Sequence, residues 1–273
     1  MQPFPGPRHA LQATTYEELE QFVWQFVEGN YSLLILIGAP GLAKSQTIKR
    51  AIGNRRHLYL ETHATAFAMY QELYKHRGLA VVVDDIDHIY SDRASVRLLK
   101  SLCNTDKVKV LRWPSRHREI GNGTDQTPAQ FTTTSPVCLI ANEWRTLNAN
   151  VQAIEDRAII VNFTPTAGEV HVKARQWFGD MDVYHFIEEH LQYITRPSMR
   201  HYVKGQQLRR ADPNNWQDHL LTVMGLEDHW RAFVRIIHDQ GYAGEAERAA
   251  EFKALGLGDR STYYRWRKKL RRG

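Results

Sequence analysis

A loop of the type that holds phosphates is the clearest chemical signal in the sequence. It runs from Gly38 to Ser45 in the order Gly-Ala-Pro-Gly-Leu-Ala-Lys-Ser. In such a loop, backbone N–H groups and the positive end of the following helix face the phosphates, the lysine contacts the β and γ oxygens, and the serine hydroxyl ligates Mg²⁺. The sequence therefore predicts binding of ATP with Mg²⁺. The residues expected to contact this cofactor are Gly38, Gly41, Ala43, Lys44, Ser45 and Gln46.

One position of this loop departs from the usual pattern. Ala43 stands where G-x-x-x-x-G-K-[ST] has its last glycine. Its methyl group would crowd the phosphates slightly. The alternative is a coincidental glycine-rich turn, but an apolar run before the loop and a helical pattern after it favour the phosphate-binding interpretation.

Two consecutive carboxylates follow a valine-rich segment forty residues after Lys44. They are Asp84 and Asp85, directly after Val81–Val83. A carboxylate at the C-terminal edge of a neighbouring parallel strand lies beside the phosphate loop, where open α/β sheets bind ligands. Asp84 is thus predicted to lie on the Mg²⁺ side of the site and Asp85 to orient the attacking water. The alternative for each is a strand-end cap, and for Asp87 the two roles are evenly balanced.

A parallel sheet has to position these groups, and the apolar pattern supplies its strands. Continuous apolar runs alternate with helical patterns, which is typical of a parallel sheet covered on both faces. One helix is expected after the capping boxes at residues 14–18, and a second from the phosphate loop through residue 52. Two more are expected at residues 65–76 and 94–103. A polar segment at 108–134 predicts a hairpin or long loop, and the pattern after residue 165 is helical. The expected strands are residues 33–37, 57–60, 79–83, 137–141 and 158–163.

Over about the first 200 residues, the loop, the carboxylates and the order of elements resemble the AAA+ ATPase family. The resemblance implies an α/β fold: a five-stranded parallel sheet with flanking helices, then an all-helical lid and a C-terminal helical module. It implies an ATP hydrolase in which Asn142, at the end of the strand between those of the loop and of Asp84, senses the γ-phosphate. It also implies an arginine finger at Arg157, or less favourably Arg145, that acts on a neighbouring subunit of an oligomer.

The same resemblance divides the chain and places a further arginine. It implies a nucleotide-binding core at residues 1–165, a helical lid at 166–225 and a basic helical module at 226–273. Arg200, at the start of a lid helix, matches the position of the family's second sensor residue, an arginine. For both Arg157 and Arg200, the alternative is that the residue is an ordinary basic side chain near a helix end. Most active members have Glu where this chain has Asp85, and a carboxylate displaced by about 1 Å can slow a reaction by about 10²-fold.

The whole net charge of +6 lies in the last fifteen residues. Residues 1–258 sum to zero, whereas residues 259–273 carry seven basic side chains and one acidic one. Three helical patterns, with Gly-Leu-Gly before the last, follow the outline of a helix-turn-helix and resemble transposase-type modules. A helical projection places Tyr263, Trp266 and Leu270 on one face. The opposite face, expected to contact DNA phosphates, carries Arg265, Lys268, Lys269 and Arg272.

Two alternatives concern these basic residues. The terminal helix could instead dock an acidic protein or remain solvated. A second DNA contact in the segment 108–134 is conceivable, with Trp113 available for stacking, although an exposed loop with scattered charges is the favoured interpretation. The side chains in question are Lys107, Lys109, Arg112, Trp113, Arg116 and Arg118.

Composition excludes several other classes of protein. The chain of 273 residues has no apolar run of about 18 residues and no secretory pattern at its start, so neither a membrane protein nor a secreted one is expected. Cys103 and Cys138 are too few for a disulfide scaffold or a four-cysteine zinc site, and we expect buried thiols in a reducing cytoplasm. A small-molecule kinase would leave Asn142, Arg157 and the basic helix unexplained.

The sequence therefore favours an oligomeric AAA+ ATPase, in a ring or filament, that acts on or with DNA as a loader, an initiator or a regulator of transposition. One alternative is a nucleotide-gated scaffold or regulatory switch with slow hydrolysis that recruits protein partners. Another is a protein-remodelling AAA+ ATPase whose basic helix binds a protein. Loss of DNA binding on removal of residues 259–273 would distinguish the first hypothesis from the last.

Overall fold

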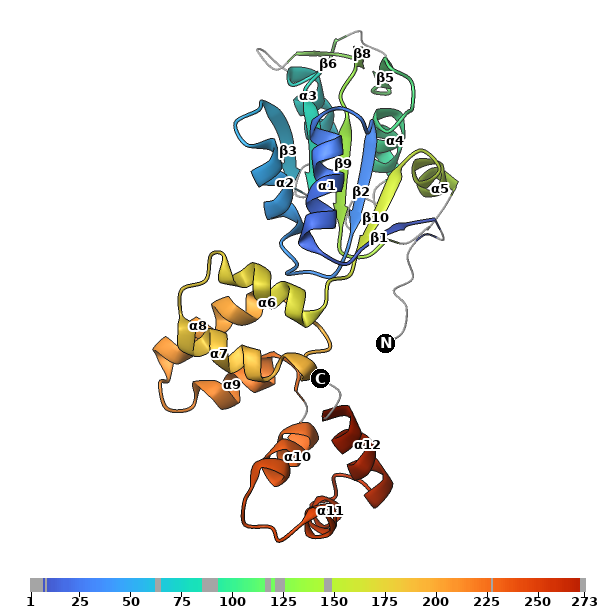
Figure 1. Ribbon diagram of the computed structural model, residues 1–273. Helices are drawn as coiled ribbons and strands as arrows, with labels where there is room; N and C mark the ends of the chain where they lie inside the picture. Colours follow the sequence, from blue (N-terminus) through green and yellow to red (C-terminus); the bar gives the residue numbers. More distant parts are fainter. Residues whose placement is uncertain are drawn as a thin grey trace. The chain divides into compact units, whose positions relative to one another are not determined.

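The computed structural model divides the chain into two compact units, Met1–Thr166 and Ala167–Gly273 (Figure 1). Among the described residues, no helix is long and apolar enough to cross a membrane. The structure describes residues 7, 9–61, 65–84, 93–115, 119–120, 126–144, 149–226 and 228–270.

A parallel sheet forms the centre of the first unit. Its strands lie in the order β1-β10-β2-β9-β4-β3, and every neighbouring pair is parallel. The predicted α/β fold is confirmed, and β9 lies between β2 and β4 as the resemblance implied. These strands are β1 (Leu11–Ala13), β2 (Leu33–Ile37), β3 (His57–Glu61), β4 (Ala80–Asp84), β9 (Val137–Ala141) and β10 (Ile159–Phe163).

The prediction of five strands was wrong by one, because β1 adds a sixth strand at the edge. This strand has three residues and pairs with β10, with Leu11 opposite Val161. Leu11 and Gln12 are exposed and only Ala13 is buried, so the segment lacks the continuous apolar run that marks a buried strand.

Helices cover both faces of the sheet. Thr15 begins α1 with the predicted capping box, in which its side chain accepts from the N–H of Glu18. Helices α1 and α2 lie on one face (Figure 1), while α3, α4 and α5 pack their buried residues against the other, around Ile35, Val81 and Leu139. The bounds are α1 (Tyr16–Val27), α2 (Lys44–Ile52), α3 (Ala66–Lys75), α4 (Arg93–Leu102) and α5 (Ala149–Glu155).

The two thiols behave as expected for a sheet covered on both faces. Cys103 and Cys138 are free and fully buried. Burial raises the pKa of the Cys103 thiol to about 12, and it raises the pKa of Cys138 as well. Both thiols are therefore inert core residues at neutral pH.

The inserted segment forms the predicted hairpin. Strand β5 (Lys109–Arg112) pairs antiparallel with β8 (Gln130–Thr133), and β6 (Glu119–Ile120) pairs with β7 (Thr127–Pro128). The favoured interpretation of an exposed loop with scattered charges was wrong for Lys109. Lys109 is 2% exposed and donates to the Ser135 carbonyl at 2.6 Å, and burial lowers its pKa. Trp113 packs against Phe67 and Tyr70, whereas Arg116 and Arg118 lie outside the described residues.

The second unit is helical throughout its described residues, as predicted. A short 3₁₀ turn, Leu191–Tyr193, separates its second and third helices. A separate cluster of buried side chains, including Phe233, Phe252 and Tyr263, holds the last three helices together. The helices are α6 (Ala167–Arg175), α7 (Met181–Glu189), α8 (Arg200–Ala211), α9 (Trp216–Val223), α10 (Asp228–His238), α11 (Glu245–Ala254) and α12 (Arg260–Leu270).

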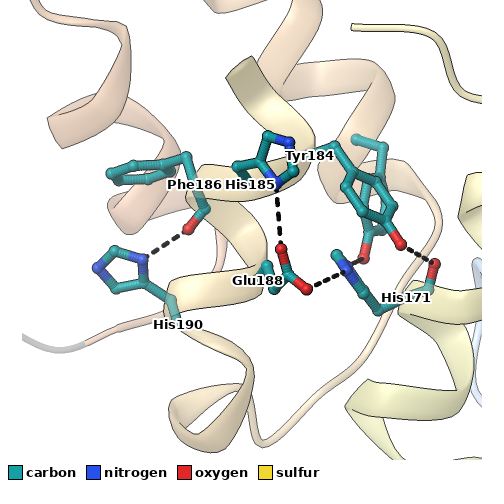
Figure 2. A network of polar contacts seen from close by, with 7 residues as sticks. His171, Tyr184, His185, Phe186, Glu188 and His190 are labelled. Carbon is teal, nitrogen blue, oxygen red and sulfur yellow. Dashed lines mark hydrogen bonds and ion pairs between the residues drawn. The ribbon is translucent and has the colours of Figure 1, made fainter. Parts of the chain in front are cut away.

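A buried histidine joins the first three of these helices (Figure 2). The His171 ring stacks on Tyr184 with the ring centroids 3.9 Å apart, and its Nδ1 lies 3.0 Å from the Tyr202 hydroxyl. Its Nε2 lies 3.7 Å from Glu188, which also contacts His185. Burial lowers the pKa of His171 despite the nearby carboxylate. At neutral pH, a neutral imidazole therefore ties α6 to α7 and α8.

Candidate nucleotide-binding site

The phosphate loop connects the end of β2 to the start of α2, as the motif requires. At its beginning, Gly38 lies so close to the neighbouring strand that a Cβ atom would come within 2.7 Å of the Phe163 carbonyl oxygen. Further along, Gly41 has a φ of 82°, a conformation that favours glycine. The chain then enters α2 at Lys44, so the N–H groups of the first helical turn face the loop.

Ala43 adopts the left-handed conformation just before α2. Its φ is 59° and its ψ is 23°, and it is the non-glycine residue with positive φ among those that the structure describes. An L-residue with a Cβ atom pays about 1–2 kcal/mol for this conformation. The usual glycine is thus replaced without a change of backbone shape, at a cost in strain.

Replacing Ala43 with glycine is expected to relieve this strain. We expect Ala43→Gly to raise the free energy of unfolding by about 1 kcal/mol, because the removed strain exceeds the entropy that glycine adds to the unfolded chain. Urea unfolding measures this change, with Ala51→Gly inside α2 as the control. In Ala51→Gly, glycine is expected to destabilise the helix by about 1 kcal/mol. If Ala43→Gly also lowered the free energy of unfolding, that result would contradict the claim that the backbone of Ala43 is strained.

The Lys44 side chain lies buried across the loop. It is 5% exposed, and its ammonium group donates to the carbonyl oxygens of Gly38 at 2.6 Å and Ala39 at 3.0 Å. The same group lies 3.5 Å from Oδ1 of Asn142, the residue that follows β9. The structure therefore brings together two of the predicted site residues, which follow the adjacent strands β2 and β9 and lie 98 positions apart.

Asp84 ends β4 at the same edge of the sheet and contacts a residue that the sequence prediction had missed. The Tyr59 hydroxyl donates to Oδ2 of Asp84 at 2.5 Å. Burial and the Asp84 carboxylate raise the pKa of Tyr59. Tyr59 therefore contacts one of the two residues predicted to hold Mg²⁺. The sequence indicated only that Tyr59 lies in a short predicted strand, and nothing in it pointed to a contact with Asp84.

The donors at this edge fit a magnesium ion. Ser45 supplies a hydroxyl oxygen and Asp84 a carboxylate oxygen, the kinds of ligand that this hard cation prefers. Within the described ranges, no group of three or more His, Cys, Asp or Glu side chains could hold a metal by itself. A sparse set of protein oxygens suits Mg²⁺, which usually keeps several waters and shares the phosphates of its substrate.

The remaining predicted site residues lie in different places. Gln46 is exposed in the first turn of α2. Arg157 follows α5, is partly buried and donates to the Lys100 carbonyl of α4 at 3.4 Å. Arg200 begins α8 in the helical unit and is exposed. Asp85, Asp87 and Arg145 lie outside the described residues.

Helix α12 has the two faces that the projection predicted. Tyr263 is fully buried, and Trp266 packs against Phe233 and Phe252. On the other face, Arg265 and Lys268 are exposed. The side chains of Lys269, Leu270 and Arg272 lie outside the described part of the chain.

Two acidic residues fix α12 in place. Asp259 accepts from the N–H of Thr262 at 2.7 Å, and these hydrogen bonds lower its pKa to about 2. Glu245 of α11 accepts from Tyr263 and Arg267, both at 2.8 Å. Arg267 is therefore part of the packing of this module, whereas the exposed cations of α12 are available to a partner.

Comparisons with known proteins give only distant similarities. No protein-family model matches the chain, and no curated protein matches it. Two variants of RuvB from Thermotoga maritima are each 14% identical, with TM-scores of 0.47 and 0.48; the matches cover 89% and 92% of this chain and 82% and 87% of those chains. PCH-2 from C. elegans is 12% identical with a TM-score of 0.41, over 76% of this chain and 67% of that one.

Proposed function

We propose that this chain is an AAA+ ATPase that binds ATP with Mg²⁺ at residues 38–46 and acts with DNA. The observation that carries the proposal is the convergence of three side chains at one edge of the sheet. Lys44 begins the helix after β2, Asn142 follows β9 and Asp84 ends β4, and these three strands are adjacent in the sheet. Ligands of open α/β sheets bind at this carboxyl edge.

Each residue has a distinct task in this proposal. Lys44 holds the β and γ oxygens, and the backbone between Gly38 and Ser45 surrounds the phosphates. Ser45 and Asp84 would hold Mg²⁺, which when bound offsets the negative charge of the transferring phosphoryl group. Asn142 orients the γ-phosphate, and Asp85 positions the water that attacks it. Water adds to the γ-phosphorus as the bond to ADP breaks, which releases ADP and inorganic phosphate.

Two arginines connect the proposed site to oligomerisation. Arg157 is proposed to reach the nucleotide of a neighbouring subunit, and Arg200 to sense nucleotide from the lid. Support for Arg157 comes from its place between α5 and β10, where the family carries its finger. An arginine supplied in trans stabilises charge in the transition state, so the proposed ATPase works as a ring or filament.

Binding to DNA is assigned to the helix-turn-helix outline at residues 226–273. Support comes from the exposed Arg265 and Lys268 on a helix whose Tyr263 and Trp266 side chains pack inward. Lys269 and Arg272 are proposed to extend the same basic face. A loader, an initiator or a regulator of transposition would use such a module to bring a nucleotide-driven assembly to DNA.

A nucleotide-gated scaffold is the second candidate, and Asp85 is the residue that favours it. The shorter carboxylate would place the attacking water less well than Glu does. We expect Asp85→Glu to raise the rate of phosphate release from ATP by about tenfold or more. The measurement compares single-turnover and steady-state phosphate release by the native chain and the variant, with the exposed Asp106→Glu as the control.

The result decides between the two candidates. An ATPase that works as a motor should show measurable turnover in its native form, with stimulation by DNA. A native chain that releases almost no phosphate, together with a variant that gains activity, would support the scaffold. A third candidate, a protein-remodelling ATPase, requires that DNA does not bind even at low salt.

A further inference from the structure

Tyr59 contacts one of the side chains that would hold magnesium. Its hydroxyl donates to Oδ2 of Asp84 at 2.5 Å. Tyr59 comes from β3, and Asp84 ends the neighbouring strand β4. The phenol therefore fixes one oxygen of the carboxylate at the carboxyl edge of the sheet.

The hydrogen bond between Tyr59 and Asp84 has a defined donor. The short distance and the carboxylate partner indicate a charge-assisted bond, with the phenol of Tyr59 as the donor. In this arrangement Asp84 keeps its other oxygen for an additional partner.

Neighbouring contacts hold the phenol ring in place. The Lys49 ammonium lies 4.2 Å from the centroid of the Tyr59 ring, one turn of α2 beyond Ser45. Lys49 is also within 3.7 Å of the Glu61 carboxylate. Glu61 lies opposite Asp84 in the β3–β4 pair. The same stretch of β3 therefore contacts α2 through Lys49 and β4 through its strand pairing. Tyr59 is thus held by a helix on one side and a strand on the other.

We propose that Tyr59 is a positioning residue for a divalent cation, which it serves by orienting the carboxylate of Asp84. This inference rests on the proposed nucleotide site and adds a determinant of its magnesium requirement. Residues that orient metal ligands typically change metal affinity or activity by 10–100-fold when they are mutated. Loss of the phenol hydroxyl should therefore weaken the response to Mg²⁺, and it should leave binding of metal-free nucleotide unchanged.

The test is a magnesium titration of Tyr59→Phe with a fluorescent ATP analogue. Binding is measured first in EDTA and then across Mg²⁺ concentrations. We expect unchanged affinity in EDTA and a rise of about tenfold in the Mg²⁺ concentration that gives half of the full effect. Tyr70→Phe is the matched control: it removes another buried hydroxyl, which donates to the Pro128 carbonyl at 2.9 Å, and should leave both values unchanged.

A double-mutant cycle with Asp84→Asn identifies the route of the effect. If Tyr59 acts through Asp84, Tyr59→Phe should change the magnesium requirement much less in the Asp84→Asn background. An unchanged requirement in Tyr59→Phe, or an equal loss of affinity in EDTA, overturns the positioning role while the native chain still binds nucleotide. A native chain that binds no nucleotide with Mg²⁺ overturns the proposed function and this inference with it.

Discussion

Replacing Lys44 with alanine is expected to weaken the binding of ATP with Mg²⁺ by at least about 100-fold. The native ammonium lies buried among the loop carbonyls, at the point where the phosphates would lie. A hydrogen bond to a charged group contributes about 1.5–3 kcal/mol, so two such bonds to phosphate oxygens account for a loss of this size. Equilibrium binding of a fluorescent ATP analogue measures it.

The control for this prediction is Lys75→Ala. Lys75 lies near the surface in the last turn of α3 and pairs with Glu72 at 3.3 Å, so its removal also deletes one lysine from the same unit. Circular dichroism of both variants checks that they remain folded. Nucleotide affinity that falls equally in both variants, or in neither, would contradict the assignment of Lys44.

Reversing the charge of Arg265 and Lys268 together is expected to reduce DNA affinity by at least about tenfold. Both side chains are exposed on α12, and each phosphate contact releases counterions from the duplex. The slope of log affinity against log salt should therefore become shallower by about 2 in the double variant. Fluorescence anisotropy of labelled duplex DNA, measured across a range of salt concentrations, gives both quantities.

A matched variant separates this local effect from the change in net charge. Lys204 and Arg210 are exposed on α8, and reversing both changes the net charge by the same amount. We expect this control to retain most of the affinity and the native salt slope. Equal losses in the two double variants would indicate a general electrostatic effect and would remove α12 from its proposed role.

The fold was predictable where a single element carries its own signal. β2 and β9 are buried along their whole length, so each appears in the sequence as a continuous apolar run. β1 carries no such signal, because its pairing with β10 decides its conformation. Lys109 was misjudged for a related reason. The pairing of β5 with β8 places Lys109 on the same inward face as Leu111, while Val110 between them is 41% exposed.

The site was predictable to the same extent. The motif specifies the backbone of the phosphate loop, and strand order then brings Asn142 and Asp84 to its edge. Tyr59 could not be assigned from the sequence, because its contact with Asp84, 25 positions along the chain, depends on the register in which β3 and β4 pair. The backbone strain at Ala43 was equally hidden, since the sequence shows an added methyl group and gives no dihedral angle.

The binding of ATP by the native chain, measured by isothermal titration calorimetry with and without Mg²⁺, tests the central claim most directly. The convergence of Lys44, Asn142 and Asp84 predicts saturable binding of one ATP per chain that is tighter with Mg²⁺ and lost in Lys44→Ala. Absence of saturable binding at millimolar ATP with Mg²⁺, from a folded native chain, would contradict it.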